Sequence, residues 1–271
     1  MRKISLVVSD VDGTLVTTDK VLTDRSRAAV ARLDAAGIGF SIISSRPPFG
    51  LRMLVEPLRL RLPMGAFNGA ALVSPDLKLL DQRDLPTEVV REAMTTFRSR
   101  SIGAWLFTAD RWLLENADGA YVGKEIRTIR TQPTVVDDLG NHLDAVSKVV
   151  GVSDDFGRVA DCETLLRHLL GERASVVRSQ RYYLDITPAG TSKGLLLAEL
   201  AGRLGVPIDE IVTIGDMEND VPMFRNSGFG IAMGNASAEV KRVANALTLA
   251  NDEDGFADAI ERIVLPRAAS G

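Results

Sequence analysis

Two aspartates two positions apart end the apolar stretch LVVSDVDGTLV, residues 6–16. In an extended chain the residue between them, Val11, points the opposite way, so the carboxylates of Asp10 and Asp12 project to the same side. An aspartate can attack phosphorus and form an aspartyl-phosphate. We therefore expect one acid of this pair to act as a nucleophile and the other to manage the proton.

Further polar residues stand where other predicted elements begin or end. Ser44 and Ser45 end an apolar strand, Lys193 begins an amphipathic helix, and the segment GDMEND at 215–220 closes another strand. Each of these alone also fits a helix cap, a turn or a solvated side chain. In an open α/β sheet, however, ligands bind in the crevice beyond the carboxyl ends of the strands. We expect these groups to meet in that crevice.

Several carboxylates in one crevice would repel one another unless a cation neutralised them. Oxygen ligands suit Mg²⁺, which is commonly held by one or two carboxylates, waters and a substrate phosphate. The phosphate oxygens need donors, and the Ser44 hydroxyl, the backbone N–H groups of Gly13 and Ser45, and the Lys193 ammonium can supply them. The pattern predicts a magnesium-dependent site for a small phosphate ester.

The elements that position these residues alternate between strand and helix in two separate parts of the chain. Apolar strands are predicted at 4–9, 38–44 and 64–69, with helices between them, and the same rhythm returns after Pro188. Apolar strands that alternate with helices indicate a parallel sheet covered on both faces. We expect an α/β, doubly wound core.

In the middle of the chain, strands and helices no longer alternate. The segment 69–85 reads as a hairpin, and paired short strands with separate helices follow from about 86 to 185. That arrangement is typical of an antiparallel α+β unit. We therefore expect a core made of residues 1–81 and 188–271, interrupted by an α+β module at 82–187.

Composition excludes several classes of protein. The 271 residues are 45% hydrophobic and 25% charged, and the formal charge of −4 gives no reason to expect a nucleic-acid partner. One cysteine and two histidines argue against a disulfide, a multi-histidine zinc site and a Ser-His-Asp triad. No apolar run approaches the ~20 residues of a membrane span, and no signal-peptide pattern is present. We expect a cytoplasmic protein without a membrane partner, as a monomer or small homo-oligomer.

Together these segments resemble the motifs of the haloacid dehalogenase superfamily of phosphohydrolases. DVDGTL at 10–15 matches the first motif, Ser44 in SIISSRP the second, Lys193 in TSKG the third and IGDMENDVPMF at 214–224 the fourth. The insert between the second and third motifs is similar to the cap of the Cof-type (IIB) subgroup, whose members also have a pattern like NGA, here residues 68–70. The resemblance implies a Rossmann-like core with an α+β cap.

The resemblance also implies roles for the candidate residues. Asp10 would be the nucleophile and a Mg²⁺ ligand, and Asp216 the second carboxylate ligand. Asp12 would be the general acid and then the base, with its backbone carbonyl on the metal; an acid role requires its pKa to be raised. The other candidates are Ser44, Ser45, Lys193 and Asn219 for the phosphate, Arg46, Asn68 and Gly69 for substrate contact, and Gly13 and Asp220 as supporting residues.

One position departs from the subgroup, which usually has T-G-R at the second motif. Here the residues are Ser44, Ser45 and Arg46. Ser44 keeps the hydroxyl, whereas Ser45 adds a side chain where glycine would allow a close backbone approach. We expect this to change how substrate fits near Arg46.

The expected function is a magnesium-dependent phosphatase that hydrolyses a small phosphorylated metabolite, such as a sugar phosphate, through an aspartyl-phosphate. A cap that closes over the site would limit substrate size. A phosphotransferase or mutase would use the same intermediate with a sugar hydroxyl as acceptor, and the sequence does not separate the two. A signalling receiver module also uses acids, Mg²⁺, a hydroxyl and a lysine, but such a module is about one ordinary domain long and lacks a long insert.

Aromatic residues of the insert have two interpretations. Trp105, Trp112, Tyr182 and Tyr183 could line a sugar-binding face. Burial within the cap explains them equally well, and we favour burial.

Overall fold

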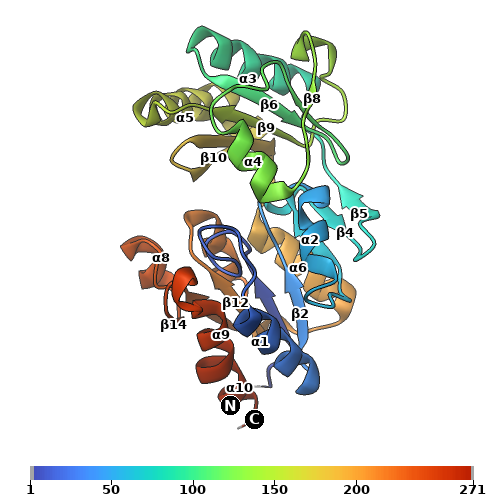
Figure 1. Cartoon of the computed structure of the whole chain (residues 1–271), viewed down its shortest axis with the longest axis vertical. Helices are drawn as coiled ribbons and strands as arrows, with labels where there is room; N and C mark the ends of the chain where they lie inside the picture. The colour runs from blue at the N-terminus through green and yellow to red at the C-terminus, as the bar shows by residue number, and fades with distance from the viewer. Residues whose placement is uncertain (1–2, 270–271) are drawn as a thin grey trace.

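A parallel five-stranded sheet forms the base of the computed structural model, which describes residues 3–269 (Figure 1). The strand order is β14-β13-β12-β1-β2, and each neighbouring pair is parallel. The strands are β1 (Leu6–Ser9), β2 (Gly39–Ile42), β12 (Ile211–Gly215), β13 (Phe229–Ala232) and β14 (Ala246–Leu247).

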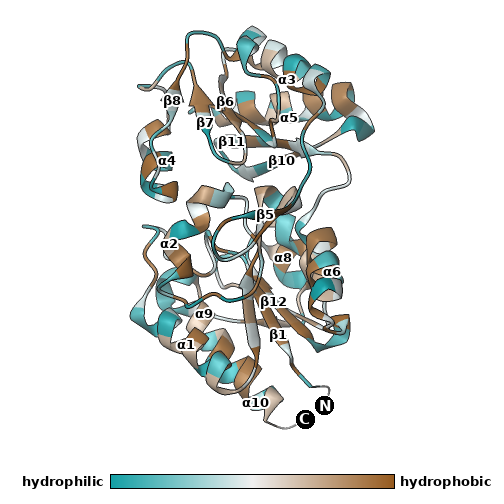
Figure 2. Ribbon diagram, turned by 90° about the vertical axis from the view of Figure 1, so that its right-hand side faces the viewer, coloured by the Kyte–Doolittle hydropathy of each residue, from teal (hydrophilic) through white to brown (hydrophobic). Residues whose placement is uncertain are grey.

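Side chains of β1 alternate between the two faces of this sheet. Val7 packs in a cluster with residues of α1 (Asp24–Ala35) and α9 (Gly255–Asp258), whereas its neighbour Val8 packs with residues of α6 (Lys193–Leu204). Figure 2 shows hydrophobic residues concentrated along β1 and β12 between these helices. The predicted α/β class, with a parallel sheet covered on both faces, is confirmed.

Local sequence explains where the core helices begin. The Thr23 side chain accepts a hydrogen bond from the backbone N–H of Ser26 and caps α1. Ser192 caps α6 in the same way, through the N–H of Leu195, and so fixes Lys193 as its first residue. Pro48 opens a short 3-10 turn that leads into α2 (Arg52–Val55).

The third strand is shorter than predicted. It ends at Ala66, because Phe67 and Asn68 adopt positive φ angles of 51° and 56° and turn the chain back. A single bridge from Ile43 to Gly65 joins it to the parallel sheet. It belongs instead to an antiparallel three-stranded sheet of β3 (Met64–Ala66), β4 (Ala71–Val73) and β5 (Leu79–Gln82).

The inserted module contains a six-stranded sheet in the order β10-β11-β9-β6-β7-β8. The antiparallel pairs β6–β7 and β10–β11 are confirmed, while the short helix α4 and strand β8 had no counterpart in the prediction. Two helices, α3 and α5, share a hydrophobic cluster with this sheet. The elements are α3 (Thr87–Ser99), β6 (Gly103–Phe107), β7 (Trp112–Leu114), α4 (Val122–Ile129), β8 (Thr134–Val135), β9 (Lys148–Val152), α5 (Phe156–Leu170), β10 (Ala174–Gln180) and β11 (Tyr183–Pro188).

The module packs directly on the core. Figure 1 shows that α4 extends from the module toward α2 of the core. The rings of Phe67, in the core, and Phe107, in the module, meet edge to face with centroids 6.4 Å apart. We propose the division at 81/82 and 187/188; β5 and β11 each cross it by one residue.

Further helical segments of the core follow β12, β13 and β14. They are the short turn η6 (Glu218–Asp220), α7 (Val221–Arg225), α8 (Ala238–Val243) and α10 (Leu265–Ala268). Among residues 3–269, no helix combines the length and apolar character that crossing a membrane requires.

Candidate active site

Three buried carboxylates meet at the carboxyl ends of two adjacent strands. Asp10 follows β1 directly and Asp216 follows β12, and the two strands pair in register. With Asp220 they place one oxygen each within 4.8 Å of one another. Asp10 is 4% exposed, Asp216 is 6% exposed and Asp220 is fully buried, so water does little to screen their repulsion.

A buried lysine lies between two of these acids. The Lys193 ammonium donates to Asp10 Oδ1 at 2.6 Å and to Asp220 Oδ1 at 2.7 Å. The other oxygen of Asp220 accepts the backbone N–H groups of Asp216 and Met217. Asp220 therefore fixes both the lysine and the loop that carries Asp216.

The pKa values of Asp10 and Asp216 are both raised. Burial raises the pKa of Asp10 to about 7 against the opposing charge of Lys193, and the Asp220 carboxylate adds to the rise. Burial, followed by repulsion from Asp10, also raises the pKa of Asp216 well above its usual value. A crowded set of buried carboxylate oxygens is suited to a hard divalent cation such as Mg²⁺.

Gly13 makes room for Asp216. Its φ is +87°, and a Cβ atom at this position would lie 2.4 Å from Asp216 Oδ2. Thr14 Oγ1 donates to Asp216 Oδ1 at 2.8 Å, and Asn235 Nδ2 donates to Gly13 O at 2.9 Å and to Asp216 Oδ2 at 3.2 Å. Neither donor is among the residues predicted from the sequence. Thr14 stands inside the first motif, but Asn235 follows β13 without any local signal.

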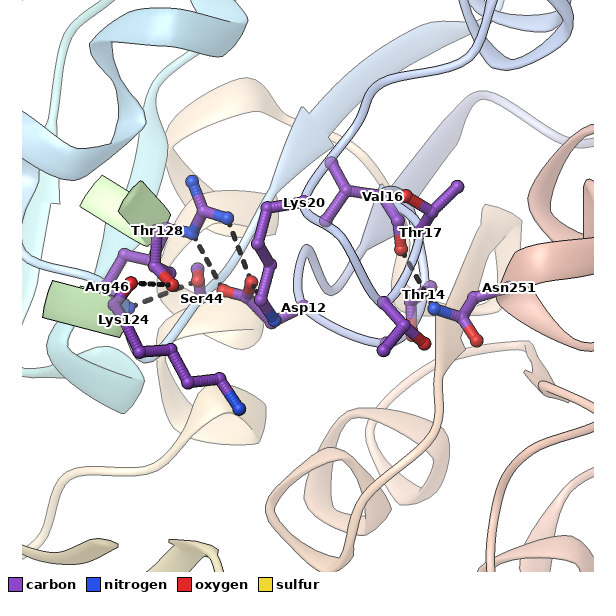
Figure 3. Close-up of polar contacts among 12 residues, drawn as sticks. Asp12, Thr14, Val16, Thr17, Lys20, Ser44, Arg46, Lys124, Thr128 and Asn251 are labelled. Atoms are coloured by element: carbon purple, nitrogen blue, oxygen red, sulfur yellow. Dashed lines mark hydrogen bonds and ion pairs between the residues drawn. The ribbon is translucent and has the colours of Figure 1, made fainter. Parts of the chain in front are cut away.

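Asp12 has different partners from Asp10. Arg46 binds it in a bidentate manner, with Nε 2.7 Å from Oδ2 and Nη2 2.8 Å from Oδ1, and the Lys20 ammonium lies 2.8 Å from Oδ1 (Figure 3). Burial by itself would raise the pKa of Asp12, but Arg46 and Lys20 outweigh it and hold that pKa well below its usual value. The expected rise is therefore wrong for this arrangement, because no spacing along the chain indicates that two cations converge on Asp12.

The second motif contacts both parts of the chain. Ser44 is fully buried, and its hydroxyl accepts the backbone N–H of Arg46 at 3.1 Å. Ser45 is partly exposed, and its carbonyl accepts a hydrogen bond from Lys148 of the inserted module at 3.3 Å. The substituted residue of this motif thus lies at the junction with the module.

Asn68, Gly69 and Asn219 lie beside the start of α6. Asn219 Nδ2 donates to Asn68 Oδ1 at 2.9 Å. Gly69 has a φ of +104°, and a Cβ there would lie 2.4 Å from the carbonyl oxygen of Ser192. The NGA turn therefore packs against the residue that precedes Lys193.

The inserted module adds charged residues that no motif indicated. Lys148 and Asp185 form a buried ion pair at 2.8 Å, and Asp185 also accepts from Asn68 Nδ2 at 3.3 Å. The Tyr183 hydroxyl donates to Glu125 at 3.1 Å. Lys148 lies on β9, Tyr183 and Asp185 on β11 and Glu125 on α4, so only the folded chain brings the three elements together.

The aromatic residues of the module divide into two groups. Trp105 and Trp112 are buried and pack against each other with ring centroids 5.1 Å apart, as the burial interpretation predicts. Tyr183 is also buried and packs on Trp105, with ring centroids 5.3 Å apart. Together with Tyr182 it lines a cavity of about 50 Å³ between core and module, which Asp12 and Arg46 also line.

Comparisons with known proteins agree on one family. A model of the haloacid dehalogenase-like hydrolases matches residues 7–260. The 5-amino-6-(5-phospho-D-ribitylamino)uracil phosphatase YwtE of Bacillus subtilis is 27% identical over 283 residues, covering 95% of this chain and 97% of YwtE. The HMP-PP phosphatase of Cronobacter sakazakii is 28% identical over 236 residues, covering 85% and 84%. A haloacid dehalogenase-like hydrolase from Bacteroides thetaiotaomicron superimposes with a TM-score of 0.87 at 32% identity, over 96% of this chain and all of that one.

Proposed function

Because this chain belongs to the haloacid dehalogenase-like hydrolases and is a phosphatase of the Cof type, we propose that it hydrolyses a small phosphorylated metabolite, such as a sugar phosphate, through an aspartyl-phosphate. The observation that carries the proposal is the buried contact of Lys193 with Asp10, the acid at the end of β1. A phosphoryl oxygen bound to Asp10, the proposed nucleophile, would meet this cation.

The residues present fit a magnesium ion. Asp10 and Asp216 offer buried carboxylate oxygens, Asp220 supports them, and Gly13 leaves the space beside Asp216 free of a side chain. We assign the metal to Asp10, Asp216 and the backbone carbonyl of Asp12. Bound there, Mg²⁺ would neutralise the carboxylates and polarise the phosphoryl oxygens.

In the first step a carboxylate oxygen of Asp10 attacks phosphorus, and the bond from phosphorus to the ester oxygen breaks. Lys193, the Ser44 hydroxyl and the Ser45 N–H hold the phosphoryl oxygens in this step. The leaving oxygen takes a proton, for which Asp12 is the proposed donor.

In the second step a water molecule attacks the phosphorus of the aspartyl-phosphate. Asp12 accepts the proton of that water, and the Asp10 carboxylate and inorganic phosphate are released. The contacts of Asp12 with Arg46 and Lys20 favour its carboxylate form, which suits this second step. The first step requires these contacts to loosen when substrate is bound.

Hydrolysis of p-nitrophenyl phosphate with and without Mg²⁺ tests the proposal. We expect the wild type to release phosphate only with the metal, and Asp10→Asn to be inactive while its circular dichroism stays that of the wild type. Asp118→Asn, at an exposed position of the inserted module, is the matched control and should keep full activity.

Three results would count against the proposal. Substantial turnover by Asp10→Asn would remove Asp10 from the nucleophile role. Release of p-nitrophenol that depends on an added sugar would indicate a phosphotransferase. No release from p-nitrophenyl phosphate or from a panel of sugar phosphates would overturn the hydrolase assignment. The cytoplasmic location, the monomer or small homo-oligomer and the lack of nucleic-acid and membrane partners stay predictions.

A further inference from the structure

We propose that the cavity between core and module binds a second anionic group, a carboxylate or a phosphate, on the leaving group of the substrate, and that Lys124 selects for it. The inference rests on the proposed function, because it takes Asp12 as the residue that serves the leaving oxygen. It deepens that function by naming the kind of phosphate ester that fits.

The position of the cavity identifies which part of the substrate it would hold. Asp12, Ser45 and Arg46 line it from the core, whereas Asp10 and Lys193, on the side of the attacked phosphorus, are not part of its lining. A group bound in this space lies beyond Asp12 from the nucleophile. The cavity is therefore the place for the leaving group, not for the transferred phosphoryl group.

Cations outnumber carboxylates around this cavity. Four cationic side chains and two carboxylates line it, and a third carboxylate pairs with one of the cations from outside the lining. The excess is one positive charge even when every group is ionised. The cations are Lys20, Arg46, Lys124 and Lys148, and the acids are Asp12, Glu125 and Asp185.

Three of the four cations already have carboxylate partners. Arg46 and Lys20 share Asp12, and Lys148 pairs with Asp185 at 2.8 Å. Within residues 3–269, no carboxylate lies within ion-pair distance of the Lys124 ammonium, which instead lies 4.5 Å from the centre of the Tyr182 ring. Lys124 is thus the cation of the cavity that remains for a ligand.

Glu125 does not offset this charge strongly. It is 9% exposed and accepts a hydrogen bond from the Tyr183 hydroxyl at 3.1 Å. Burial raises the pKa of Glu125, which favours its neutral form. Figure 3 shows that Lys124 extends from α4 of the module while Lys20 reaches Asp12 from the core, and both line the same cavity.

The chemistry of the leaving group follows from this arrangement. Lys193 and the proposed metal ligands bind the transferred phosphoryl group, so the Lys124 ammonium remains for the rest of the substrate. A neutral polyol would leave the Lys124 ammonium without a counter-charge in a partly desolvated space, whereas an anionic group would form a charge-assisted hydrogen bond with it. The cavity of about 50 Å³ favours a short group of this kind.

Two pairs of substrates test the inference. 3-Phosphoglycerate differs from glycerol 3-phosphate only in a carboxylate that replaces a hydroxymethyl group, and fructose 1,6-bisphosphate adds a second phosphate to fructose 6-phosphate. We expect the wild type, with Mg²⁺, to prefer the anionic member of at least one pair by about tenfold in kcat/KM. The pair that shows the preference identifies the anion. Equal use of both members of both pairs would overturn the inference.

Two variants on the same helix locate the effect. Lys124→Met should reduce the preference to below about threefold, since the contact with the anion is lost. Arg127→Met removes a charge from an exposed position of α4 that does not line the cavity, and it should keep the preference of the wild type. An equal loss in both variants would assign the effect to the net charge of the helix and overturn the role of Lys124.

Binding to Asp10→Asn separates this inference from the proposed function. Isothermal titration with the same four compounds and Mg²⁺ should show the same preference without turnover. A preference in binding combined with no hydrolysis by the wild type would overturn the phosphatase proposal and leave the anion site standing. Hydrolysis by the wild type combined with no difference in affinity within either pair would overturn the anion site alone.

Discussion

The Lys193 ammonium lies 2.6 Å from Asp10 Oδ1, at a position where Lys193 is only 1% exposed. The proposed nucleophile and its neighbouring cation are therefore removed from water as a pair. A buried ion pair contributes little net stability, but removing one partner leaves an uncompensated charge.

Lys193→Met should impair both activity and stability. We expect kcat/KM to fall by about 10²- to 10³-fold, because one donor to the transferred phosphoryl group is lost. The metal-free variant should lose about 3 kcal/mol of unfolding free energy, since Asp10 and Asp220 lose their cation. Urea unfolding with and without Mg²⁺ checks the second effect, and the metal should restore part of the loss. Lys78→Met, which removes an exposed lysine, is the control. Unchanged kinetics in Lys193→Met would contradict the assignment of Lys193 to the third motif.

Gly13→Ala and Gly37→Ala should differ although both glycines have positive φ angles, +87° and +71°. The methyl carbon added at position 13 would lie 2.4 Å from Asp216 Oδ2, whereas at position 37 nothing lies within 4 Å. We expect Gly13→Ala to lose at least about 10²-fold in activity, because the added methyl group would displace Asp216, a proposed metal ligand. Gly37→Ala should cost about 1–2 kcal/mol of stability and keep its activity. Phosphatase assays and thermal unfolding measure both effects, and equal activity of the two variants would contradict the assigned contact.

Asn235→Ala should weaken the response to metal. Asn235 holds Asp216 at 3.2 Å and the Gly13 carbonyl at 2.9 Å, so its loss frees a proposed ligand. We expect the Mg²⁺ concentration for half-maximal activity to rise about tenfold or more, with little change in the melting temperature. Asn141→Ala, at an exposed asparagine of the module, should leave that concentration unchanged. A wild-type metal response in Asn235→Ala would place Asp216 outside the metal site.

Cys162 should resist alkylation in the folded protein. It is fully buried, and burial raises the pKa of its thiol from 9.0 to about 11. Between pH 9 and about 11 the thiol of the unfolded chain ionises while the folded protein keeps the neutral thiol. The free energy of unfolding therefore falls as the pH rises through this range. Iodoacetamide at about pH 8 should modify Cys162 only as fast as the protein opens, and rapidly in denaturing urea. Rapid modification of the native protein would show that helix α5, which carries Cys162, opens easily.

Residues next to an element boundary could be predicted from the sequence. Two of the acids, Asp10 and Asp216, directly follow strands of the parallel sheet, and Lys193 begins a helix that packs on it. The carboxyl ends of parallel strands lie at the same edge of a sheet. Their convergence follows from topology, without knowledge of the packing between distant side chains.

Contacts that depend on tertiary packing could not be predicted. Lys20 lies in a loop and Arg46 after β2, yet both reach Asp12 and reverse the expected direction of its pKa. Lys148 comes from the module and meets Ser45 of the core. No spacing along the chain signals such pairs.

Backbone geometry explains the errors in the elements themselves. The segment 64–69 is predicted to be a strand, but Phe67 and Asn68 adopt positive φ angles. Their residue types do not indicate this conformation. Helix α4 has only eight residues and no side-chain cap, and Tyr121 and Arg130 at its ends also have positive φ angles. It lacked the start and stop signals on which a prediction rests.

The strand order of the core has a consequence for folding during synthesis. β1 leaves the ribosome early, but its neighbour β12 follows only after the entire module has been made. The module contains all six strands of its own sheet between Gly103 and Pro188, so it can fold while the core is still incomplete. Ribosome-bound chains that have just emerged to residue 190 should resist protease in the module and be cleaved around β1. The nascent chain would then acquire the part proposed to select its substrate before the part proposed to perform its chemistry.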